Sequence, residues 1–325
     1  MWFIYALLAT IAWGCADLFY KKGADEQDKY SHLKTSVMVG VVMGIHAFIM
    51  LIISGFDYNF LNLLIYLPVS LMYILSMTVG YFGLRYLELS VSSPIQNASG
   101  VVSAIIMILV LQQLPAPIEY VAIALITAGV VLLGIFEKQK EDLYEVENNK
   151  KYKIGFIAFF MPIAYCIIDS IGTALDGIYL DDFTKTPLVG VTEENFEDVA
   201  NISYELTFLI VAIALFIFIK FIKKEKFGLF EQKDRAGAAI FETAGQFAYV
   251  YAMSGNGVVA APMIASYSFV SILLSRIFLK EKLSKKQYLA VALVMFGIVI
   301  LGVVEGLLEA ENLPQWVMTL IGAEE

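Results

Sequence analysis

The chain is poor in charge, which water-soluble proteins need to cover their surfaces. Only 16% of its 325 residues are charged, whereas 59% are hydrophobic, and the mean hydropathy is +0.74. A soluble fold has too small an interior for that much apolar side chain. The composition therefore predicts an integral membrane protein.

Cysteine and histidine are also scarce, with two residues of each. Cys15 and Cys166 lie inside apolar runs, where a thiol usually behaves as a small buried hydrophobe, so neither a disulfide framework nor a zinc site is indicated. The runs also lack the HExxH and GxSxG motifs of metal-dependent and nucleophilic hydrolases. We expect no enzymatic activity, no cofactor, no metal and no nucleic-acid partner.

Runs of about 20 apolar residues, the length that crosses a bilayer as a helix, recur along the chain. They are continuously apolar, unlike the ten-residue alternation of a membrane barrel. The sequence predicts an all-α membrane protein with ten transmembrane helices, near 2–20, 35–54, 63–84, 94–112, 119–136, 154–175, 204–222, 236–252, 259–279 and 287–304.

The basic residues are segregated between the joints that connect these runs. When alternate joints are assigned to opposite sides, all 22 Lys and Arg except Lys185 fall on one side. The side rich in Lys and Arg is normally cytoplasmic. We therefore predict a multi-pass protein of the cell membrane with both termini outside. The acidic joint 176–203, including Asp176, is interpreted as a solvated outer loop.

The chain also matches itself at an offset of 168 residues without a gap. This offset pairs Pro94 with Pro262, Tyr81 with Tyr249 and Gly129 with Gly297, among other identities. Each half holds five helices, an odd number, so the halves would enter the membrane from opposite sides as an inverted repeat. The predicted organisation is a first repeat at 1–136, a basic linker at 137–153, a second repeat at 154–304 and a tail at 305–325.

These features resemble the drug/metabolite transporter superfamily, in particular its ten-helix EamA-type members. The segment 252–302 carries the likeness best, with Glu281 at the family's usual glutamate and Gly297 in its closing helix. In the first half, the Trp13–Gly14 pair resembles the first-helix signature. The resemblance implies a solute transporter with a central cavity, but the superfamily's substrates are too varied to name one.

Three acids lie within predicted spans, where a charge is costly: Asp17, Asp169 and Glu242. Trp13 precedes Asp17 and Tyr165 precedes Asp169 by four residues, so in each case ring and carboxylate share a helix face. These positions are candidates for binding a solute or a coupling proton. The alternative is structural, with Asp17 reaching the membrane surface and Asp169 hydrogen-bonding a neighbouring helix.

Other polar and aromatic residues extend the candidate site. Gln246 lies one turn beyond Glu242 on the same helix face, and amides and hydroxyls follow both prolines, although helix packing would explain these equally well. The remaining candidates for binding or coupling are Tyr81, Gln96, Asn97, Tyr249 and Tyr267. His46 is interpreted as a hydrogen-bonded interior residue, with a proton relay as the alternative.

Aromatic rings and acids without a mid-membrane Lys or Arg favour a cationic or zwitterionic solute, because ring faces attract ammonium groups. The sequence thus predicts a secondary-active, alternating-access transporter of a small amine, amino acid or drug-like metabolite, with membrane lipid as its surroundings and the proton as a candidate coupling ion. The alternatives are a membrane ligand sensor, a non-transporting binding protein and, less favoured, an intramembrane enzyme.

Overall fold

The structure is a computed structural model that describes residues 1–25, 27–83, 96–145, 156–228, 230–278, 283–308 and 314–322. Pro94 and Glu281, singled out by the sequence, lie outside these residues, as does the 146–153 part of the predicted linker. The described residues form helices and joints, and no strand lies among them. The predicted all-α class is therefore confirmed.

The helices follow the apolar runs closely, because a backbone surrounded by lipid must satisfy its hydrogen bonds within itself. Three short turns of other helix types interrupt them at Phe218–Ile222, Phe230–Gln232 and Ala265–Tyr267. The α-helices are α1 (Trp2–Gly23), α2 (Ser31–Ile53), α3 (Leu61–Ile65), α4 (Leu67–Gly83), α6 (Ser99–Leu111), α7 (Pro117–Glu145), α8 (Phe156–Leu180), α9 (Phe196–Ile217), α10 (Lys233–Ile264), α11 (Ser268–Phe278), α12 (Lys285–Leu308) and α13 (Gln315–Ile321).

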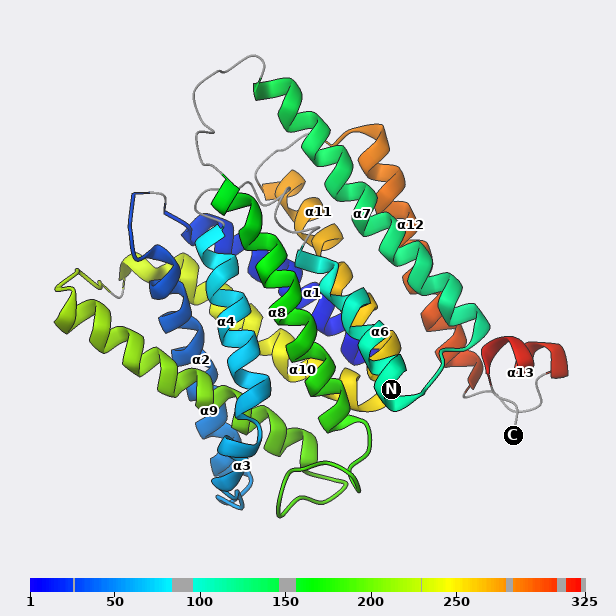
Figure 1. The fold of residues 1–325 in the computed structure, drawn as a ribbon, viewed down its shortest axis with the longest axis horizontal. Helices are drawn as coiled ribbons and strands as arrows, with labels where there is room; N and C mark the ends of the chain where they lie inside the picture. The colour runs from blue at the N-terminus through cyan, green and yellow to red at the C-terminus, as the bar shows by residue number, and fades with distance from the viewer. Residues whose placement is uncertain are drawn as a thin grey trace.

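Among the described residues, seven helical stretches are long and apolar enough to cross a membrane, and α4 and α6 are shorter apolar helices. One of the seven, Phe230–Phe278, has 49 residues, about twice the length that a bilayer requires. Asn256 interrupts the helical geometry of α10 with φ −162° and ψ 75°. In Figure 1 the yellow ribbon of α10 runs downward across the middle of the bundle, and the chain then returns upward to α11.

Some predicted boundaries were wrong. The break of α10 at Asn256 lies between the spans predicted at 236–252 and 259–279, but α7 continues to Glu145 inside the predicted linker and α8 continues to Leu180. The last difference matters most, because it moves Asp176 from a predicted outer joint into a helix.

The helices pack in pairs across the bundle (Figure 1). The α2–α9 pair forms one flank and the α7–α12 pair the other, while α1 packs on α10 and α4 packs on α8 between them. These four central helices surround the middle of the molecule, where the candidate site lies.

Two glycines set the contact between α7 and α12. A Cβ added at Gly129 would lie 2.5 Å from Val294 Cγ2 and 2.8 Å from the Ala290 oxygen. A Cβ added at Gly297 would lie 2.7 Å from Ile126 Cγ1 and 2.9 Å from the Ala122 oxygen. Small residues allow backbones to approach this closely, which is how helices attract one another in lipid. The order of these contacts makes the two helices antiparallel.

The α7–α12 contact yields a stability prediction. Replacing Gly297 with Ala forces a methyl group against the backbone of α7, so we expect a loss of about 1–3 kcal/mol, the usual cost of overpacking. The matched control is Gly306→Ala in the same helix, where an added Cβ meets nothing within 4 Å. Thermal unfolding in detergent should show a lower midpoint for Gly297→Ala alone, and equal midpoints would contradict this packing.

Candidate functional site

A cavity of about 80 Å³ lies among the four central helices, with α6 and the Ala265–Tyr267 turn completing its wall. A single water needs roughly 10–15 Å³ by the same measure, so there is room for a small molecule or several waters. All the residues predicted from the sequence line it: Trp13, Asp17, Tyr81, Gln96, Asn97, Tyr165, Asp169, Glu242, Gln246, Tyr249 and Tyr267.

The two aspartates occupy related environments on α1 and α8. Ser271 of α11 donates a hydrogen bond to Asp17 at 2.8 Å, and Ser99 of α6 donates one to Asp169 at 2.7 Å. Ser76 of α4 donates a second bond to Asp169 at 3.1 Å. Asp17 and Asp169 are only 9% and 8% exposed, so neither reaches the surface as the structural alternative for Asp17 would have it.

The aromatic residue that precedes each aspartate packs against a glycine of a facing helix. Trp13 lies on Gly245 of α10, and Tyr165 lies on Gly80 of α4, where an added Cβ would come 2.9 Å from its ring. Glycine is needed at both points because any side chain would push the ring aside. The rings therefore lie close to the backbone of the facing helices.

Glu242 of α10 ends a chain of hydroxyl groups. The Tyr81 hydroxyl donates to the Tyr20 hydroxyl at 2.8 Å, and the Tyr20 hydroxyl donates to Glu242 Oε2 at 3.1 Å. The Trp13 indole donates to the Glu242 carbonyl oxygen at 3.3 Å, which fixes α1 on α10 at this level. Tyr20 was not predicted, although its position three residues after Asp17 on the same helix was a signal for it.

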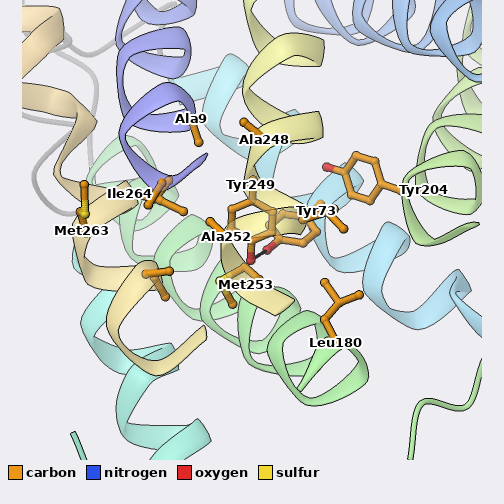
Figure 2. Close-up of a cluster of buried hydrophobic side chains, with 14 of the residues drawn as sticks. Ala9, Tyr73, Leu180, Tyr204, Ala248, Tyr249, Ala252, Met253, Met263 and Ile264 are labelled. Carbon is orange, nitrogen blue, oxygen red and sulfur yellow. Dashed lines mark hydrogen bonds between the residues drawn. The ribbon is translucent and has the colours of Figure 1, made fainter. Parts of the chain in front are cut away.

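Aromatic rings that contact one another line part of the cavity. Trp13 stacks on Tyr249 with 5.2 Å between ring centres and meets Tyr267 edge-on at 6.0 Å. Figure 2 shows Tyr73 and Tyr249 joined hydroxyl to hydroxyl, a bond of 2.7 Å, with the ring of Tyr204 beside them. Faces of this kind attract cations.

Charge in the cavity is of one sign. Among the described residues that line it are three carboxylates, Asp17, Asp169 and Glu242, and no Lys, Arg or His. Gln246 adds a neutral polar group that is 1% exposed, and both its amide atoms lack a hydrogen-bond partner. Buried polar groups are normally paired, so this amide is free to bond a ligand.

Asp176 corrects the prediction of a solvated outer loop. It is fully buried in α8, and the Tyr66 hydroxyl donates a hydrogen bond to its Oδ1. Its Oδ2 has no partner. The sequence missed it because the predicted helix ended at residue 175, one residue too early to count it as an intramembrane acid.

Glu205 was missed as well, one residue inside the predicted start of its span at 204. It is fully buried in α9, and both its carboxylate oxygens lie 2.8 Å from Nδ1 of His46. The hydrogen bond expected for His46 is therefore present, and its side chain is 29% exposed. This pair is not part of the cavity wall. Within the described residues, no group of three His, Cys, Asp or Glu is placed to hold a metal.

Comparison with known families agrees with this arrangement. The model of the EamA-like transporter family matches residues 1–135 and 204–303, which together make up most of the chain. The chain belongs to the EamA-like transporter family, and it is a multi-pass membrane protein of the drug/metabolite transporter type.

Solved structures share the fold. Of the 28 chains that match, one described only as a protein in a crystal structure has a TM-score of 0.65 and 12% sequence identity, and the match covers 94% of this chain and 98% of that one. At this identity the likeness concerns the fold alone. No curated protein matches the sequence.

The unpartnered amide of Gln246 gives a prediction. In the absence of solute, Gln246→Met should raise the midpoint of thermal unfolding, because each unpaired buried polar atom costs about 1–3 kcal/mol. Asn62→Leu is the matched control. Asn62 is also fully buried, but its amide bonds the Val189 backbone twice, at 2.9 and 3.0 Å, so this variant should unfold at a lower temperature. A large loss of stability in Gln246→Met would mean that the amide is structural.

Proposed function

We propose that this protein is a secondary-active transporter that moves a small cationic or zwitterionic organic solute by alternating access. The observation that carries the proposal is the central cavity, which combines three carboxylates with stacked aromatic rings. Its described lining residues include no Lys, Arg or His. An ammonium group would be attracted by both the carboxylates and the ring faces. A phosphate or carboxylate solute would meet only like charge. In this proposal the protein is a carrier and not an enzyme.

Ten membrane crossings are the arrangement that best fits the helices. The seven long stretches give ten crossings if α4 and α6 also cross and the 49-residue segment crosses twice, bending at Asn256. The proposed repeats remain 1–136 and 154–304, joined by 137–153 and followed by a tail at 305–325.

The helix contacts support an inverted pair of halves. If α1, α2, α4, α6 and α7 correspond in order to α8, α9, the first part of α10, α11 and α12, exchanging the halves turns the α1–α10 contact into α8–α4, and both exist. The α2–α9 and α7–α12 contacts map onto themselves. Gly129 and Gly297, which are 168 residues apart, make equivalent contacts. Such symmetry allows a central site to open to either side in turn.

Both termini belong on one side of the membrane in this arrangement. The Met1 ammonium group lies 2.6 Å from Glu305 Oε1 near the end of α12, which supports a common side. The charge segregation makes this the outer side of the cell membrane.

Proton exchange is the coupling that the cavity acids allow. A carboxylate held away from water needs a neutralising partner, either a proton or a bound cation. Asp169 of α8 and Glu242 of α10 both reach the cavity from the second half, so a cation that binds between them would displace a proton from either. Solute and proton would then occupy the site in turn.

Counterflow in proteoliposomes tests the transport function. Vesicles are loaded with unlabelled tyramine, lysine, alanine, glutamate or glucose, and uptake of the same labelled compound is measured. We expect exchange of tyramine, lysine or alanine without exchange of glutamate. Exchange of glutamate alone would contradict the cationic preference. Binding without any exchange would favour a ligand sensor.

The cavity acids can be tested one at a time. Asp169→Asn and Glu242→Gln keep the size of each side chain but remove its charge, and we expect each to reduce pH-driven transport at least about tenfold, in line with the loss of a buried charge partner. Glu193→Gln, an exposed acid in the joint before α9, is the matched control and should transport normally. Unchanged transport in the cavity variants would mean that both acids have only a structural role.

A further inference from the structure

A second polar cluster lies outside the cavity, where α2 packs against α9. His46 of α2 faces the fully buried Glu205, with Nδ1 at 2.8 Å from both carboxylate oxygens. The His46 side chain is 29% exposed. The edge of its ring meets Phe247 of α10 at 5.4 Å between ring centres. A buried acid in this position costs free energy unless a strong partner stabilises its charge.

Glu205 is the innermost member of a polar stripe along α9. Asp198, Asn201 and Glu205 are spaced by three and four residues, so they lie on one face of the helix. Asn201 is fully buried, and neither of its amide atoms has a hydrogen-bond partner.

The stripe continues to the end of α9 that meets the 181–195 joint. There the Tyr251 hydroxyl donates to Asp198 at 2.6 Å, and the Ser254 hydroxyl donates to Glu197 at 3.1 Å. Asp198 and Glu197 are half-buried, so this end of the stripe is reached from solvent while Glu205 is not.

The groups around His46 make a proton the natural ligand of the cluster. His46 contacts Glu205, and the other titratable groups on the elements around this contact are Asp198 and Glu197 of α9, Tyr251 of α10, Tyr5 of α1 stacked on Tyr251, and Tyr58 bonded to Ser203 of α9. A neutral imidazole beside a carboxylate leaves the pair with one negative charge. One added proton makes the pair neutral, and its charge would then no longer have to be held in a region without water.

The place of the pair links protonation to helix packing. Helices α2 and α9 approach closely, since a Cβ on Gly44 would lie 2.7 Å from the side chain of Leu209 and Gly40 lies against the backbone of Phe208. In the proposed two-fold arrangement this contact maps onto itself, so a shift between these two helices would change both halves together.

We propose that His46 and Glu205 form a proton-binding site outside the solute cavity, on the face of α9 that reaches solvent at Asp198, and that protonation of this site acts on the packing of α2 against α9. The coupling role rests on the proposed transport function, whereas proton binding by the pair does not. The pair gives the protein a proton site that the solute does not occupy, so proton and solute affect each other through the fold.

Proton binding is tested first, with pH as the only variable. The chain has two histidines, so in His32→Asn protein labelled with ¹³C and ¹⁵N histidine, His46 gives the only imidazole signal. In lipid nanodiscs we expect this signal to titrate between about pH 4 and 9. Adding Glu205→Gln, which keeps a hydrogen-bond acceptor but removes the charge, should move the midpoint by about one pH unit or more. A signal that does not titrate, or an unchanged midpoint, would overturn the proposal.

Coupling is tested with labelled tyramine, or with whichever compound of the counterflow panel exchanges fastest. Glu205→Gln should lower accumulation driven by a pH gradient at least about tenfold while exchange at equal pH keeps at least about half its rate. His32→Asn, on the same helix, is the matched control and should retain both. Equal loss of exchange and accumulation, or no loss of either, would overturn the coupling role. If the unaltered protein exchanges nothing, the transport function fails, and the His46 titration still decides whether the pair binds a proton.

Discussion

The cost of holding carboxylates away from water is the constraint on which this structure depends. An ionised acid in a lipid-embedded bundle is tolerated only beside donors that replace its water. Five of the buried acids meet such a donor on another segment of the bundle. The pairs are Asp17 with Ser271, Asp169 with Ser99 and Ser76, Asp176 with Tyr66, Glu205 with His46 and Glu242 with Tyr20.

These pairings give the bundle two kinds of polar centre with different properties. In the cavity, the acids share space with aromatic faces and with an amide that has no protein partner, which leaves capacity for a ligand. At the α2–α9 contact, the acid is engaged by an imidazole in a tightly packed interface, where a proton fits and a larger ligand does not. The first centre is suited to solute, and the second to pH. In the proposed mechanism, their separation lets the transporter respond to both.

The sequence predicted much of this, because hydropathy and helical spacing are local signals. The all-α class followed from the apolar runs, and the pairing of Trp13 with Asp17 and Tyr165 with Asp169 followed from the four-residue period. All the candidate side chains line one cavity. What spacing could not give is the partner of a residue on a distant helix. Glu205 and Asp176 stand out only once α2 and α3–α4 bring His46 and Tyr66 to them, and both acids lie close to span boundaries that hydropathy places imprecisely.

The central claim is that the cavity is the place where the solute binds. An experimental structure of the full chain in lipid nanodiscs, at a saturating concentration of an exchanged amine, tests this most directly. The account predicts density for the amine beside the Trp13–Tyr249 stack, with its nitrogen within about 4 Å of a carboxylate oxygen of Asp17, Asp169 or Glu242. An amine bound away from the cavity, with the three carboxylates unchanged, would contradict it.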